Sequence, residues 1–185
     1  MSVKMAKAVG LLEIAGIAPG YLAANEVSKH TAVDLWLANP ICPGYFIVVV
    51  AGDAASVKAA MDIAAAWGEG EVISQGMLAD VDEKVLKVLQ NPPGMKPGKA
   101  MGIVETFGAA AAVLAADGAV KTAAVELVEL RIGGGMGGKA LVCFAGDVDA
   151  VESAAAHVRQ LVEPAQLAHV AVLPAPHPEI VAHWQ

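Results

Sequence analysis

Apolar and polar residues alternate along residues 7–14, KAVGLLEI, with the two-residue period of a β-strand. The segment 20–30 changes to helical spacing, with Leu22, Glu26 and Lys29 three or four positions apart. Continued to residue 89, the pattern predicts strands at 33–40, 46–52 and 71–78 and helices at 54–67 and 82–89. The predicted order is therefore βαββαβ followed by a short helix, and Asp53 is placed to cap the second helix.

This pattern recurs in the second half of the chain. Residues 7–29, KAVGLLEIAGIAPGYLAANEVSK, align with residues 99–121, KAMGIVETFGAAAAVLAADGAVK, so that the identical residues lie 92 positions apart. Farther along, FIVVVAGDAASV aligns with ALVCFAGDVDAV at a separation of 94, so the second copy carries two extra residues. The extra residues fall in GGGMGG, opposite ICPG in the first copy. The chain is therefore predicted to be a duplication whose copies differ mainly in one loop.

The duplication predicts two domains of one fold class. We expect the first domain at 1–90, a linker rich in Pro and Gly at 91–98, and the second domain at 99–185. Each copy is expected to be an α+β domain of ferredoxin-like type, because its helices alternate with strands in the order βαββαβ.

Composition and charge narrow the class of protein. The longest apolar stretch, 107–116, lies between Glu105 and Asp117 and is much shorter than the about 20 residues that cross a bilayer. The net charge of −7 disfavours nucleic acid as a partner. The N-terminus has no apolar segment typical of secretion, and two cysteines 101 positions apart imply no disulfide framework. We expect a cytoplasmic protein whose alanine-rich helices bury contact surfaces in an assembly.

The two cysteines lie in opposite contexts. Cys143, in ALVCFAG, falls in the middle of a predicted strand among apolar neighbours, so we expect it to pack in a core. Cys42, in NPICPGYF, falls in a predicted turn before Pro43 and Gly44. A lone cysteine is more often a small buried apolar residue than a ligand. The predicted turn favours the role of a ligand for Cys42.

The other conspicuous residues indicate no catalytic site. Residues 133–139, GGGMGGK, resemble a phosphate-binding loop, but such loops need a following helix and here a predicted strand follows. The histidines show no metal-ligand spacing, and no nucleophile–base or paired-carboxylate arrangement is indicated. We therefore expect a protein that is not an enzyme.

With these motifs in place, the chain resembles the bacterial microcompartment shell proteins of the tandem-domain, trimer-forming kind. The opening strand and helix of both halves and the AGD motif before each second helix carry the resemblance. ICPGYF, together with the glycine-rich loop, resembles the T-type shell proteins of propanediol utilisation. The resemblance implies a homotrimer that forms a pseudohexameric tile with a central pore, in contact with other shell proteins of the compartment.

The resemblance also implies a metal centre. In the T-type proteins one loop cysteine from each subunit points into the pore, and the three thiolates hold an iron–sulfur cluster. Carried over, this role falls on Cys42, with a [4Fe–4S] cluster as the expected cofactor. The implied function is electron transfer or cluster transport across the shell. Redox enzymes inside the shell would be the partners. The residues expected to line the pore are Ile41, Pro43, Gly44, Gly134, Gly135, Met136 and Gly137.

Lys29 and Lys121 occupy matching positions in the two repeats. The matching lysine of the family lies at the tile edge and packs against a neighbouring tile, so we expect this role at both positions. The family commonly has an arginine before a Pro-His pair near the end of the domain, whereas here Ala175 precedes Pro176 and His177. Edge packing is therefore expected to be weaker, or adapted to a different neighbour.

Two alternatives remain open from the sequence. The first keeps the tile without the metal, as a pore that conducts small polar metabolites past Cys42. The second is a duplicated ligand-sensing module with a ferredoxin-like fold. Iron content separates the first from the iron–sulfur hypothesis, and a saturable ligand with no sheet formation would favour the second.

Overall fold

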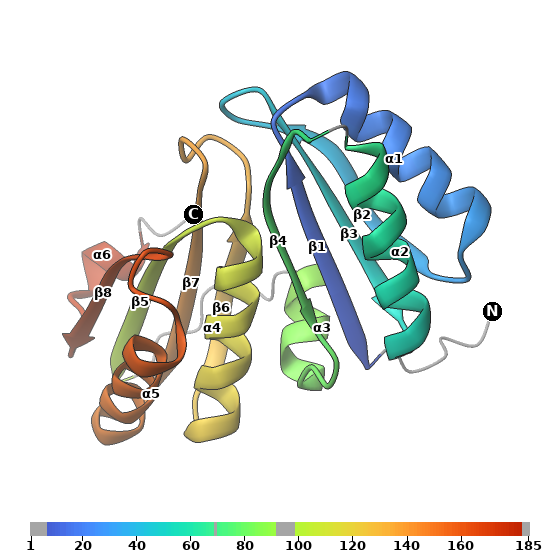
Figure 1. The fold of residues 1–185 in the computed structure, drawn as a ribbon. Coiled ribbons are helices and arrows are strands. Elements are labelled where there is room, and N and C mark those ends of the chain that lie inside the picture. The colour runs from blue at the N-terminus through green and yellow to red at the C-terminus, as the bar shows by residue number, and fades with distance from the viewer. Residues whose placement is uncertain (1–6, 69, 92–98, 183–185) are drawn as a thin grey trace. The chain divides into compact units, whose positions relative to one another are not determined.

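The computed structural model describes residues 7–68, 70–91 and 99–182. The first repeat forms a four-stranded antiparallel sheet in the order β2-β3-β1-β4. Figure 1 shows α1 and α2 side by side on one face of this sheet. Its strands and helices are β1 (Ala8–Ile14), α1 (Ile17–His30), β2 (Asp34–Ile41), β3 (Tyr45–Gly52), α2 (Ala54–Trp67) and β4 (Val72–Leu78).

The second repeat forms a sheet of the same topology, in the order β6-β7-β5-β8. Its elements are β5 (Ala100–Phe107), α4 (Ala109–Thr122), β6 (Glu126–Ile132), β7 (Lys139–Gly146), α5 (Val148–Leu161) and β8 (Leu167–Pro174). Short helices follow the two sheets, α3 (Glu83–Gln90) after the first and α6 (Pro178–Ala182) after the second. The predicted order of elements and the α+β class are therefore confirmed.

Helix α1 begins earlier in the chain than the sequence predicts. The helix begins at Ile17 rather than at residue 20, so that Pro19 lies inside its first turn. Proline is tolerated there because the first N–H groups of a helix have no partner within the helix. None of the helices in the described ranges is long and apolar enough to span a membrane.

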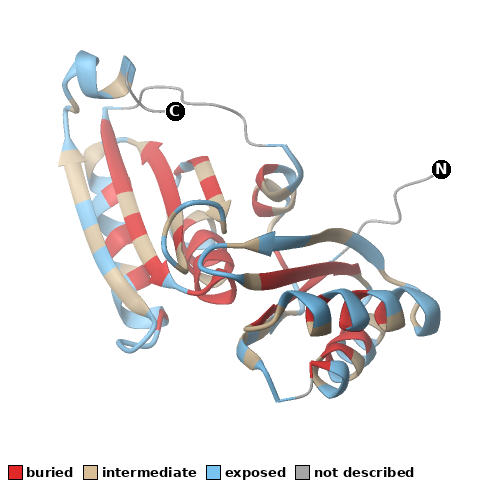
Figure 2. Cartoon of the chain, turned by 90° about the horizontal axis from the view of Figure 1, so that it is seen from above, coloured by how far each residue is buried: buried red, intermediate tan, exposed pale blue. Residues whose placement is uncertain are grey.

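Burial follows the order of the strands in each sheet. Figure 2 shows the buried residues concentrated on the central strands, and β1 is buried over its whole length. In the first repeat Leu12, Val48 and Phe46 pack against buried residues of α1 and α2. The edge strand β4 is only half-buried or exposed along its length. The central strands thus form the rigid base from which the loops project.

The chain divides into two compact units that do not follow the repeats. Of the described residues, the first unit contains those up to Val81 together with 108–110 and 133–138, and the second contains the others. Helix α3 belongs to the second unit, where it packs against β6. There the Lys84 Nζ donates to the Val125 carbonyl at 3.1 Å and pairs with Glu126 at 2.9 Å. Of the predicted linker 91–98, residues 92–98 lie outside the described residues.

Equivalent aspartates precede the second helix of each repeat. The Asp53 carboxylate accepts hydrogen bonds from the Ala55 and Ser56 N–H groups at 3.1 and 3.0 Å, as expected of an N-cap. These bonds, chiefly those from Ser56, lower the pKa of Asp53. Asp147 makes no such bond with its side chain, and its carboxylate pairs with the Lys99 Nζ at 3.0 Å.

Candidate functional site

Cys42 lies in a tight turn between two strands. Ile41 ends β2, Tyr45 begins β3, and these two residues form the last pair of the ladder. The Gly44 N–H donates to the Ile41 carbonyl at 2.9 Å and closes the turn. The thiol of Cys42 is free and exposed, as the sequence predicts for a residue in this context. A side chain held this way is presented to solvent by a rigid ladder.

The glycine-rich loop lies against this turn in the same compact unit. A Cβ placed on Gly133, whose φ is 90°, would lie 2.6 Å from the Ile41 Cγ2, closer than a side chain allows. A Cβ on Gly138 would lie 3.8 Å from the Pro43 Cδ. The structure therefore brings together the two loops in which the repeats differ, and at Gly133 only glycine allows the close approach.

The middle of the glycine-rich loop carries almost no side-chain atoms. Gly134, Gly135 and Gly137 are exposed, and Met136 between them is half-buried. No heavy atom lies within 4 Å of a Cβ built on any of these three glycines. The surface beside the Cys42 turn is thus made largely of backbone amides, which offer hydrogen-bond donors and acceptors but no charge.

One chain supplies a single thiolate ligand at this surface. In the part of the chain that the structure describes, no three His, Cys, Asp or Glu side chains gather closely enough to hold a metal ion. An iron–sulfur cluster bound at Cys42 would therefore need thiolates from several chains. The exposed thiol fits such a centre in ligand type, and its single copy per chain fits a site on a symmetry axis.

Cys143 is unsuited to this chemistry. It is fully buried on β7 in a cluster with Met101, Val128 and Ala145. Burial strongly raises the pKa of its thiol, so the thiolate that binds metals is disfavoured. The predicted packing role of Cys143 agrees with this environment.

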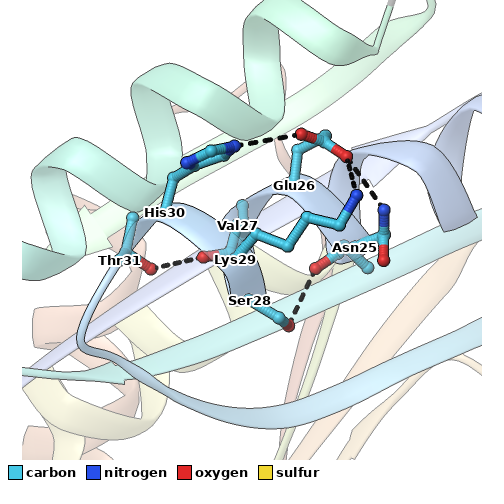
Figure 3. A network of polar contacts seen from close by, with 8 residues as sticks. Asn25, Glu26, Val27, Ser28, Lys29, His30 and Thr31 are labelled. Carbon is cyan, nitrogen blue, oxygen red and sulfur yellow. Dashed lines mark hydrogen bonds and ion pairs between the residues drawn. The ribbon is translucent and has the colours of Figure 1, made fainter.

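The two lysines expected at the tile edge are both exposed, and each has an intrahelical partner. As Figure 3 shows, the Lys29 Nζ pairs with the Glu26 Oε1 at 2.8 Å, and the His30 Nε2 lies 3.3 Å from the Glu26 Oε2. The hydrogen bond from Lys29 is the main cause that lowers the pKa of Glu26. Lys121 pairs instead with the Asp117 Oδ2 at 2.8 Å. The repeats thus hold matching lysines with different carboxylates.

Sequence reasoning did not predict the buried carboxylate of Glu13. Its Oε2 accepts from the Ala109 N–H, the first residue of α4, at 2.9 Å, although the two residues are 96 positions apart. Burial raises the pKa of Glu13, while the bonds from Ala109 and from the Ser74 side chain act in the opposite direction. The signal that marks this residue in the sequence is an acidic side chain inside the predicted strand 7–14.

Comparisons with known proteins bear on this geometry. Residues 8–81 and 100–176 each match the BMC domain. The bacterial microcompartment shell protein PduT of Citrobacter freundii is 33% identical over 174 residues, which cover 94% of this chain and 95% of that protein. A crystal structure of a microcompartment protein from Desulfitobacterium hafniense DCB is 39% identical with a TM-score of 0.87, over 95% of this chain and 98% of that one. The fused permuted hexameric shell protein of the RMM microcompartment, 22% identical with a TM-score of 0.62 over 84% of each chain, shares the fold.

Proposed function

This chain belongs to the BMC-domain family of bacterial microcompartment shell proteins, and from that premise we propose that three copies close into a tile of the shell. The tile is a pseudohexamer because each chain contributes two copies of the repeat. Lys29 and Lys121 lie at its edges and contact neighbouring shell proteins of the cytoplasmic compartment. Its role is structural, with no bond chemistry of its own.

We further propose that the Cys42 turns of the three chains meet at the central pore and hold an iron–sulfur cluster. The observation that carries this proposal is the exposed thiol, one per chain, in the turn between β2 and β3. Three thiolates suit a [4Fe–4S] cluster in which the fourth iron has a ligand that is not a protein side chain. When bound, such a cluster supplies one-electron transfer or serves as a cargo for enzymes inside the shell.

The neighbouring loop supports this position for the cluster. Gly134, Gly135 and Gly137 offer exposed backbone with no side chain, and Met136 is the only sizeable side chain between them. Around the pore, Ile41, Pro43 and Gly44 from each chain would alternate with this bare loop and leave room for a cluster. Backbone amides near cluster sulfurs also tune the reduction potential, because hydrogen bonds to the sulfurs stabilise the reduced form.

The test is anaerobic reconstitution of the full chain with iron and sulfide. We expect a broad absorption near about 400 nm that the Cys42→Ser variant loses. The matched control is Cys143→Ala, which removes the buried thiol and should retain the absorption. Native mass spectrometry of the same samples should give the mass of three chains.

Three results would contradict the proposal in different ways. Trace iron in a trimer that is otherwise intact would remove the cluster and favour the metal-free pore for small polar metabolites. A monomer would remove the tile itself. Absorption that survives in Cys42→Ser would place the iron elsewhere.

A further inference from the structure

The first sheet has a site that receives the start of a helix from the second repeat. This site lies on the face of β1 and β4 that carries Glu13, Ser74 and Gly76, opposite to α1 and α2. Residues 108–110 belong to the same compact unit as this face. A Cβ built on Gly108 would lie 2.8 Å from the Ser74 Oγ, and one built on Gly76 would lie 2.7 Å from the Ala110 Cβ. With the bond from the Ala109 N–H to Glu13, these contacts define the Glu13 site.

Each residue of the Glu13 site has a counterpart in the other repeat. The separation of 92 relates Glu13 to Glu105 and relates Ala109 and Ala110 to Ile17 and Ala18. In the sheets, Glu13 pairs with Ser74 as Glu105 pairs with His169. In the same way Leu11 pairs with Gly76 and Ile103 pairs with Ala171. The counterpart site on the second sheet, which we call the Glu105 site, therefore consists of Glu105, His169 and Ala171.

The two sites differ sharply in burial. Glu13 is buried, whereas Glu105 is half-buried, with 37% of its side chain exposed. His169 and Ala171 are exposed as well. Within its chain, Glu105 has an ion pair with the Lys139 Nζ at 3.0 Å. A carboxylate has about four acceptor positions, so this pair leaves capacity for a further N–H donor.

The start of α1, which corresponds to the start of α4 at residues 109 and 110, is exposed, whereas the start of α4 is buried. Ile17 is 42% exposed and Ala109 is 1% exposed. The N-cap residue of α1, Gly16, provides no side-chain hydrogen bond to the first turn. Tyr21, one turn farther along α1, is a second large apolar residue exposed near Ile17. An uncapped helix start with apolar neighbours is suited to a surface that offers a carboxylate and small residues.

We infer that the Glu105 site binds the first turn of α1 from a neighbouring copy of this chain, with the Glu105 carboxylate accepting from the Ile17 N–H. The inference rests on the proposed trimer, in which the second repeat of one chain must meet the first repeat of the next. The contact repeats between chains what Glu13 and Ala109 do within one compact unit. His169 takes the place of Ser74, and both residue types can donate a hydrogen bond to the carboxylate.

Small residues on both partners allow this close approach. In the Glu13 site, Gly76 faces Ala110, and the counterparts are Ala171 and Ala18. A Cβ at the Gly76 position would lie 2.7 Å from the Ala110 Cβ, so the alanine pair Ala171 and Ala18 must lie farther apart than this. A displacement of about 1 Å brings the two β-carbons to the about 3.8 Å that a disulfide requires. This spacing makes the inference testable by cross-linking.

The experiment uses the full chain carrying Cys42→Ser, so that its exposed thiol does not interfere, with Ala18→Cys and Ala171→Cys together. After mild oxidation we expect denaturing gels without reductant to show a band of three linked chains. Each single variant, Ala18→Cys or Ala171→Cys alone, is the control and should not give that band. Mixing the two single variants should give linked pairs only, because each chain then carries one partner of the disulfide.

The outcomes separate this inference from the proposed function. A native trimer with no linked chains, or with the disulfide closed inside single chains, overturns the inference and leaves the trimer standing. A chain that is monomeric in native mass spectrometry overturns both.

A second measurement does not depend on the engineered cysteines. Glu105→Ala should weaken the trimer, because a charged acceptor is lost at each contact. In sedimentation experiments, the chain concentration below which the trimer dissociates should rise by at least about tenfold. The control is Glu152→Ala, which removes an exposed carboxylate of α5 and should change nothing. Equal dissociation of the two variants would contradict the inference.

Discussion

The turn between β2 and β3 and the loop between β6 and β7 join equivalent strands, yet they have little in common. The first has three residues between its strands, including an exposed thiol and a proline. The second has six residues, five of them glycines with positive φ. The strands on either side keep the same order and register. The difference teaches that the duplication preserved a scaffold and let one loop diverge, as expected where loops carry function on a rigid sheet.

The largest expected effect comes from the contact between these two loops. Gly133→Val should lower the free energy of unfolding by about 2–4 kcal/mol, because it combines a left-handed backbone with a clash against Ile41. Gly135→Val, at a φ of 75° with no neighbour within 4 Å, should cost about 1–2 kcal/mol from the backbone alone. Urea unfolding at one chain concentration measures both variants. Equal losses would show that the loop does not depend on its contact with the turn.

Substitutions of the two cysteines are expected to change stability by an intermediate amount. Cys143→Ser should destabilise the iron-free protein by about 1–3 kcal/mol, because it places a hydroxyl among Met101, Val128 and Ala145. Cys42→Ser should stay within about 0.5 kcal/mol of the parent, since its side chain is exposed. Thermal unfolding without iron makes the measurement. A large loss at Cys42 would indicate that its thiol has a packing role.

The smallest effect is expected at the two aspartates that precede the second helix of each repeat. The folded-state pKa of Asp53 is lowered, so its contribution to stability is present above the pKa of the unfolded chain and is lost as the pH falls through the folded value. Asp53→Ala should therefore lower the unfolding temperature near neutral pH and lose its effect below about pH 4. Asp147→Ala should lower that temperature less, because its side chain does not cap α5. Thermal scans across this pH range compare the two variants.

Much of the fold could be predicted from the sequence because its determinants are local. The apolar strand segments and the Asp53 cap are properties of short segments, and the duplication repeats the order of strands and helices. The exposure of Cys42 follows from the turn residues beside it. The start of α1 was less predictable, because the helical pattern begins clearly only after Pro19.

What the sequence did not indicate depends on residues far apart in the chain. The burial of Glu13 requires the N–H of Ala109, and the place of α3 in the second unit requires β6. Neither contact leaves a periodic signal, because each involves a single side chain or a short helix meeting a distant segment. The role of Glu105 is hidden for the same reason, since its proposed partner lies in another molecule.

Joining the two repeats in one polypeptide fixes how often each loop occurs. A ring built from separate single repeats would present six identical turns, and any change to one turn would be copied around the whole circle. In the proposed ring of these chains, thiol-bearing and bare loops would occur in equal number and would alternate, whatever the level of expression. In the proposed ring of three chains, covalent linkage would thereby give the opening three cysteine thiols, one for each chain.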